Sequence, residues 1–267
     1  MPRSSILAFV LAVTCFASVA WSQQPEARDP ARGANSREQW RTMSVGGTQV
    51  GYVHNKVETV ERDGKEVVVN THTAVISIAL PRERGAVVAP SDTRSKITIQ
   101  SEETVDGDVL GFRYQVQNPP LVATRKVGRI SDGRMQIETE AKGNITTTTE
   151  DFPADVKGPA FADRSLWKDP LEPNETRTIT TFDPRSAKVD TVRFEARDYE
   201  NVLLMDGTEK RLLHVVSTHS VAPQHVFHEF LDEAGDSWKT TIPSQNMVVY
   251  TTSKAIALKP FTDAETP

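Results

Sequence analysis

Cysteine is nearly absent from this chain of 267 residues, because its one cysteine, Cys15, lies inside an apolar run close to the N-terminus. If that run is removed as a leader, the remaining chain contains no thiol. Disulfides, a cysteine nucleophile and thiolate metal sites are then excluded together. An exported protein of this size without disulfides is more typical of a bacterial envelope than of a eukaryotic secretory pathway.

Basic clusters are also lacking. The formal net charge is -5, and no run of lysine or arginine occurs anywhere in the sequence. A nucleic-acid partner therefore receives no support, because such proteins carry a basic face that matches the phosphate backbone. The mean hydropathy of -0.42 indicates a soluble globular protein with a modest core.

Long apolar runs are missing except near the start, where residues 1–22 have the pattern of a secretory signal peptide. Arg3 gives a positive start, residues 6–17 (ILAFVLAVTCFA) are apolar, and small residues follow at spacings that a signal peptidase accepts. The run is short for a membrane span, although an uncleaved anchor is the alternative. Residues 23–38 are polar and have no apolar period, which predicts a disordered linker. We therefore expect export to the periplasm or the extracellular space.

Alternation of apolar and polar residues dominates from Trp40 onward, as in half-buried β-strands. Asp-Gly pairs recur between strand-like runs, and Asp-Gly supplies the positive φ angles of tight hairpin turns. The four pairs are Asp63-Gly64, Asp106-Gly107, Asp132-Gly133 and Asp206-Gly207, and Gly235 marks a fifth turn. This combination predicts an antiparallel meander.

Helix signals are scarce, and residues 158–168 (GPAFADRSLWK) are the best candidate for one short mid-chain helix. Prolines flank this segment over residues 153–173, which makes it either a boundary between two halves or a crossover inside one sheet. We favour the crossover, because each half alone would have a thin core. The prediction is a mainly β fold, a curved antiparallel sheet or open barrel of about 11–13 strands. It would occupy residues 39–258 as a single domain, with a loose polar tail at 259–267.

Signatures of catalysis are missing: no Gly-x-Ser-x-Gly elbow, His-Glu-x-x-His pair, phosphate loop or dinucleotide fingerprint occurs. The nearest hint of a cluster is His54 with His72. Counting outward from the turn at Asp63 pairs His54 with Thr73, whereas a one-residue bulge would bring His72 opposite His54. A polar cross-strand pair on the solvent face is the plainer interpretation. We predict no catalytic, cofactor-binding or metal-ligating residues, and no cofactor.

Other polar pairs have structural interpretations. His225 and His228 are three residues apart, and such residues on a strand point to opposite faces. The adjacent carboxylates Glu102 and Glu103 should diverge for the same reason. Gly51 is expected to relieve a bend in the sheet, and Tyr52 is expected to pack inward.

Several segments carry a resemblance to a known group of proteins: residues 46–54 (GGTQVGYVH), 165–176 (SLWKDPLEPNET), 198–220 (DYENVLLMDGTEKRLLHVVSTHS) and 230–258. Together they are similar to the β-rich region that precedes the catalytic domain in some bacterial exported transglutaminase-like proteins. More loosely, they resemble open-barrel envelope β-proteins such as periplasmic lipoprotein carriers. A transglutaminase-like enzyme needs a Cys nucleophile, and only Cys15 is present. The resemblance therefore implies an accessory module and transfers no active residues.

The sequence thus predicts a non-catalytic exported envelope protein that binds a protein, glycan or lipid partner. We expect no nucleic-acid partner, and no stable membrane span after signal cleavage. One alternative is a lipid or lipoprotein carrier, which would show an empty apolar pocket larger than roughly 300 Å3. Another is a hydrolase with an unrecognised site, which would show a cleft where His or Glu side chains converge with shifted pKa values.

Overall fold

The computed structural model describes residues 36–77, 94–118 and 121–262. The expected fold class is confirmed: one curved antiparallel sheet dominates, and a short mid-chain helix accompanies it. The sheet has 14 strands, one more than the upper end of the expectation. They are β1 (Ser36–Val45), β2 (Thr48–Arg62), β3 (Lys65–Ser77), β4 (Arg94–Thr104), β5 (Val109–Asn118), β6 (Leu121–Ser131), β7 (Arg134–Ala141), β8 (Asn144–Asp151), β9 (Thr176–Asp183), β10 (Lys188–Leu203), β11 (Glu209–His219), β12 (Val226–Leu231), β13 (Ser237–Ile242) and β14 (Met247–Thr252). The helices are α2 (Pro159–Lys168), η2 (Pro243–Gln245) and α3 (Lys254–Thr262).

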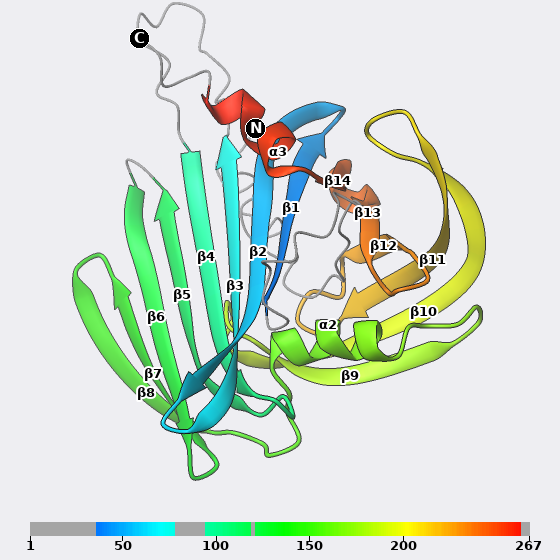
Figure 1. Cartoon of the computed structure of the whole chain (residues 1–267). Coiled ribbons are helices and arrows are strands. Elements are labelled where there is room, and N and C mark those ends of the chain that lie inside the picture. Colours follow the sequence, from blue (N-terminus) through cyan, green and yellow to red (C-terminus); the bar gives the residue numbers. More distant parts are fainter. Residues whose placement is uncertain (1–35, 78–93, 119–120, 263–267) are drawn as a thin grey trace, which may run out of the picture.

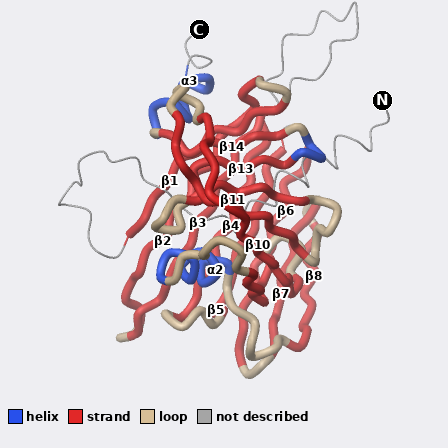
Figure 2. Tube along the Cα trace, turned by 90° about the vertical axis from the view of Figure 1, so that its right-hand side faces the viewer, coloured by secondary structure: helices blue, strands red, loops and turns tan. Residues whose placement is uncertain are grey.

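Two meanders share this sheet. Its strand order is β8-β7-β6-β5-β4-β3-β2-β1-β14-β13-β12-β11-β10-β9, so the first and last strands pair in the middle. We call β1–β8 the first wing and β9–β14 the second wing. The wings curve toward each other in Figure 1. Figure 2 shows α3 at the upper end of the molecule and α2 in its lower half.

A short segment before α2 connects the two wings at their lower end. The backbone N–H of Lys157 donates to the carbonyl of Thr180 in β9, and the N–H of Phe182 donates back to Lys157, at 3.1 and 2.8 Å. The next residue, Gly158, donates to the carbonyl of Gly107 in the β4–β5 turn at 2.8 Å. The sheet therefore stays open as a strand ladder, while this segment bridges the edge of β9 to the first wing.

Turns form at all four Asp-Gly pairs, but at Asp106-Gly107 and Asp206-Gly207 only the glycine has a positive φ. Asp63 and Gly64 have φ of 51° and 71°, and Asp132 and Gly133 have 52° and 69°. These values are those of the two-residue turn that suits twisted antiparallel strands. Lys142 and Gly143, at 53° and 77°, make the same turn between β7 and β8. The sequence analysis did not name this turn, because lysine lacks the preference that Asp has for positive φ.

The helix α2 fills the space between the wings and is held from both sides. Leu166, which is fully buried, packs with Leu213 and Leu231 of the second wing. The first wing supplies its N-terminal cap: Glu103 of β4 accepts hydrogen bonds from the N–H groups of Ala160 and Phe161, at 2.8 and 2.9 Å. A carboxylate there satisfies N–H groups that the helix leaves open and complements its dipole.

The boundaries of the folded part differ from the expectation at both ends. The strand β1 begins at Ser36, inside the expected linker 23–38, because its polar first residues pair with Glu58 and its neighbours in β2. The helix α3 continues to Thr262, where a loose tail was expected from residue 259. Of the helices in the described part of the chain, none has the length and apolarity needed to cross a membrane.

Candidate functional site

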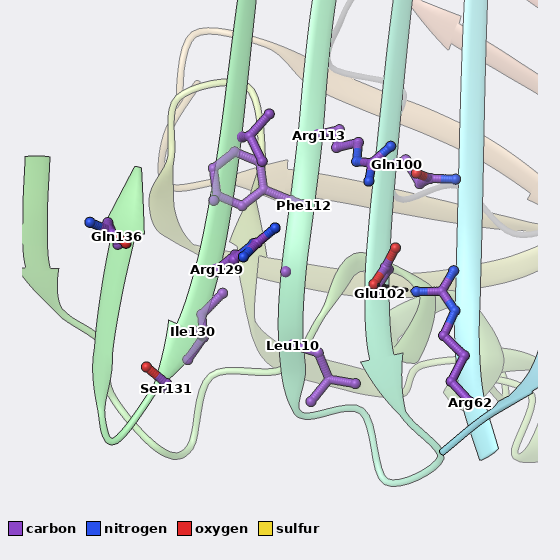
Figure 3. Close-up of a pocket in the computed structure, with 13 residues that line it drawn as sticks. Arg62, Gln100, Glu102, Leu110, Phe112, Arg113, Arg129, Ile130, Ser131 and Gln136 are labelled. Atoms are coloured by element: carbon purple, nitrogen blue, oxygen red, sulfur yellow. Dashed lines mark hydrogen bonds and ion pairs between the residues drawn. The ribbon is translucent and has the colours of Figure 1, made fainter. Parts of the chain in front are cut away.

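A hollow of about 530 Å3 lies on the outer face of β4–β7, and we call it the outer trough (Figure 3). Strand alternation fixes which face this is. Glu103 and Phe112 point into the core, so their neighbours Glu102 and Arg113 point outward. The trough is lined by Arg62, Gln100, Glu102, Leu110, Gly111, Phe112, Arg113, Val127, Gly128, Arg129, Ile130, Ser131 and Gln136.

A glycine creates the depth of the outer trough. Glu102, Gly111, Arg129 and Gln136 stand side by side on four consecutive strands. Since Gly111 has no side chain, the floor between Glu102 and Arg129 is bare backbone. A Cβ atom at Gly111 would lie 3.0 Å from the carbonyl oxygen of Gly128, so the position is also tight against β6.

Positive charge exceeds negative charge at the outer trough. Arg62 and Glu102 point toward each other and form an ion pair at 2.7 Å (Figure 3). Arg113 and Arg129 are exposed, and neither has an ion pair with any residue in the described part of the chain. Three guanidinium groups therefore face one carboxylate, on a chain whose net charge is -5. Exposed arginines of the second wing, such as Arg193 and Arg197, instead share Glu195.

This chemistry suits an acidic ligand. A guanidinium group presents a planar fork of N–H donors that matches a carboxylate or a phosphate. Gln100, Ser131 and Gln136 add neutral hydrogen-bonding groups along the same hollow. The lining contains no histidine and no cysteine, and its one carboxylate, Glu102, is paired with Arg62.

The structure separates the two histidines that the sequence analysis considered together. His54 pairs with Thr73, as counted from the turn, and His72 lies opposite Asn55, so the alternative with a bulge is wrong. His54 points outward, stacks on Trp40 at 4.1 Å and contacts Glu38 through Nε2 at 2.8 Å. His72 is buried on the inner face, where desolvation is the largest cause that lowers its pKa to about 3. His72 is therefore neutral at physiological pH.

The expectations for Gly51 and Tyr52 have different outcomes. Gly51 is buried beside a register shift between β1 and β2, and the backbone of β3, its neighbour in the sheet, leaves no room for a Cβ atom there. Tyr52 is only partly buried, and its ring lies 5.8 Å from that of Trp40 on the outer side. The expectation that Tyr52 packs inward is therefore wrong, because the alternation that buries Gly51 and Val53 turns Tyr52 outward.

A different histidine pair occurs on the outer face of the second wing. His214 Nε2 and His228 Nδ1 are 2.9 Å apart on β11 and β12, and Glu200 lies 3.4 Å from His214. The sequence analysis paired His228 only with His225 and missed this diagonal contact, which requires the register between two strands. Within the part of the chain that the structure describes, no group of three or more His, Cys, Asp or Glu residues could hold a metal ion.

One buried pair repeats part of a hydrolase triad. His219 Nδ1 contacts Asp190 Oδ2 at 2.6 Å, and both side chains are almost fully buried. In a triad the other ring nitrogen would meet a serine hydroxyl. Here Nε2 of His219 is buried without a hydrogen-bond partner among the described residues, and the ring packs against Phe227. The pair closes the turn after β11, where Asp190 also binds Ser220 and Val221.

The chain was compared with known families, curated proteins and solved structures. No family model and no curated protein matches the sequence. Among solved structures, the chain is similar to a crystal structure described as a beta-barrel-like protein of domain of unknown function DUF1849 from Brucella abortus. The two are 9% identical, and the match covers 82% of this chain and 95% of that chain with a TM-score of 0.49. A likeness of this size adds nothing about function.

Proposed function

We propose that the chain is a non-catalytic, exported binding protein of the cell envelope, and that the outer trough binds acidic groups of its ligand. The observation that carries this proposal is the excess of arginine in the trough. Arg113 and Arg129 are exposed beside a bare backbone floor, without carboxylate partners among the described residues. Several guanidinium groups gathered along one hollow attract anions more strongly than isolated ones on a flat surface.

The ligand class follows from the lining. Carboxylate or phosphate groups fit the guanidinium forks, and these groups occur on acidic glycans and on the headgroups of anionic lipids. The trough is open along the sheet and mostly polar, which suits repeated anionic groups rather than an acyl chain. This favours binding of a headgroup or a polymer over the lipid-carrier alternative, whose pocket would be apolar.

The environments of the acidic and imidazole groups also favour binding over catalysis. Glu103 caps a helix, His219 and Asp190 close a turn, and Glu229 receives a hydrogen bond from Ser217 at 2.5 Å in the interior. Each of these side chains has a structural partner and little exposure. Association with a transglutaminase-like partner stays a prediction of the sequence resemblance.

A binding experiment with two probes tests the proposal. The exported protein is titrated with an oligogalacturonate, as an acidic glycan, and with vesicles of phosphatidylglycerol, as an anionic lipid surface. The double variant Arg113→Gln/Arg129→Gln should weaken binding of the recognised probe about tenfold or more, since each lost charged hydrogen bond costs about 1.5–3 kcal/mol. The probe that responds identifies the source of the anionic group.

The matched control is Arg193→Gln/Arg197→Gln, which removes the same charge from an exposed surface of the second wing. It should change binding by less than about twofold, because distant surface charges are screened by salt. If both double variants weaken binding equally, the effect comes from the net charge of the protein alone and not from the trough. The trough would be refuted as the site if both probes bind and neither double variant weakens their binding. It would also be refuted if neither probe binds at all.

A further inference from the structure

The strand β8 ends the first wing and has one free edge. It pairs with β7 over its whole length, from Asn144 opposite Ala141 to Asp151 opposite Arg134, and no described segment pairs with its other side. All eight residues of β8 are exposed. The strand at the opposite end of the sheet differs, because the middle of β9 hydrogen-bonds to Lys157. A row of open N–H and C=O groups remains on β8.

Natural edge strands usually carry a device that prevents pairing with another chain, such as lysine, proline or a bulge. None of these occurs in β8, whose sequence is NITTTTED. Its register with β7 continues without a shift. Four consecutive threonines, Thr146–Thr149, favour extended backbone. This edge therefore has no bulge, carries charge only at Glu150 and Asp151, and can accept another strand.

The turn at Lys142 and Gly143 decides which residues offer their backbone groups. In a two-residue hairpin the flanking residues, here Ala141 and Asn144, form a hydrogen-bonded pair, and such pairs recur at every second residue. The even-numbered residues of β8 thus bond to β7. The odd-numbered residues, which include Thr147 and Thr149, direct their N–H and C=O groups to the free edge.

We propose that β8 is a homodimer interface, in which the β8 strands of two copies pair antiparallel about a two-fold axis at Thr148. In this register Thr147 lies opposite Thr149 of the second copy, so both present backbone groups to each other. Thr146 then faces Glu150 of the second copy, and Ile145 faces its Asp151. Carboxylates therefore never oppose carboxylates, and threonine pairs occupy the centre, as favourable cross-strand pairing requires.

The second copy is the occupant that this edge fits, because the strand complements itself in backbone hydrogen bonding and its carboxylates face uncharged side chains. The two-fold contact pairs the free edges of β8 in both copies with each other. No free β8 edge is then left for a third chain, as in other isologous interfaces. Ile145, whose exposed fraction is 64%, gains cover from the facing strand. If the outer trough binds as proposed above, the dimer carries two troughs on one continuous sheet and can hold a polymeric ligand at two points.

Light scattering coupled to gel filtration tests the dimer with the exported protein and needs no ligand. The wild-type chain should elute with twice the mass of one chain. Thr147→Pro/Thr149→Pro removes two outward N–H groups, leaves the bonds to β7 intact and should give a monomer. Thr147→Val/Thr149→Val keeps the backbone donors and should remain dimeric.

A second variant protects the test if the proline variant fails to fold. Thr147→Lys/Thr149→Lys places like charges opposite each other across the axis and should also give a monomer with unchanged circular dichroism. A wild-type chain that stays monomeric at high micromolar concentration would overturn the proposal. A folded lysine or proline variant that remains dimeric would do the same, since the contact would then lie elsewhere.

Discussion

Gly51 shows how closely the backbone of neighbouring strands can constrain one residue. A Cβ atom at this position would lie 2.3 Å from the carbonyl oxygen of Val75 and 2.7 Å from Cε of Met43. The methionine can move, but the carbonyl belongs to the β2–β3 ladder and cannot. The sequence analysis identified Gly51 as structural from its place in a strand; the contacts that make it so come from β1 and β3.

We expect Gly51→Val to lower the free energy of unfolding by about 2–4 kcal/mol, because overpacking a strand against backbone leaves little room to relax. Urea unfolding and the melting temperature measure this loss. Thr48→Val, at the exposed start of the same strand, should change either quantity little. Unchanged stability of Gly51→Val with lost ligand binding would contradict the structural role.

The buried carboxyl group of Glu229 should make the free energy of unfolding depend on pH. Desolvation by burial is the main cause that raises its pKa to about 7, although Ser217 and Arg41 act in the opposite direction. The native state therefore holds this proton more tightly than the unfolded chain does. The stability gained from this group is present below its ordinary pKa of 4.5 and is lost as the pH rises through 7.

Glu229→Gln should remove that loss, because the amide oxygen can still accept the hydrogen bond from Ser217. Relative to the wild type, the variant should gain on the order of 3 kcal/mol between pH 5 and pH 8. Urea unfolding of both proteins at several pH values gives the difference. A difference that does not vary with pH would show that Glu229 is ionised throughout this range.

At the scale of elements, α2 depends on a residue from another strand for its start. Gly158 precedes the helix and offers no capping side chain, so Glu103 performs that role across the interior. The short helix itself could be predicted from its local pattern. Its cap could not, because Glu103 lies more than fifty residues earlier in the chain.

Glu103→Ala should destabilise the protein by about 2–4 kcal/mol, since it leaves the N–H of Ala160 buried without an acceptor and that of Phe161 with only the carbonyl of Gly158. Hydrogen exchange at these two amides should accelerate more than exchange in the second wing. Glu102→Ala is the matched control, because its partner Arg62 is half exposed and such pairs contribute about 0–1 kcal/mol. Equal losses from the two variants would argue against the cap.

Turns show what local sequence does and does not determine. Asp63-Gly64 and Asp132-Gly133 were predicted from residue type alone, and both have the expected angles. The turn at Lys142-Gly143 uses the same geometry without the favoured residue. The start of β1 at Ser36 was also missed, since its polar first residues join the strand by pairing with β2, and so was the end of α3 at Thr262.

At the scale of the whole molecule, the alternation of residues predicted a curved antiparallel sheet but not the order of its strands. Pairing of β1 with β14 joins residues about two hundred positions apart, and no short-range pattern encodes that contact. The outer trough was hidden for the same reason. Arg62, Arg113 and Arg129 come from three strands, and each alone is an ordinary exposed arginine.

The central position of β1 and β14 has a consequence for the order in which the molecule can be completed. The hairpins of either wing need only nearby sequence, so they can assemble before the rest of the chain is available. The pairing between the two wings can form only when β14, from Met247 to Thr252, is present. Until then, one edge of β1 in the middle of the sheet has no partner strand. A nascent chain interrupted after β13 would therefore expose unpaired edges on both β1 and β13.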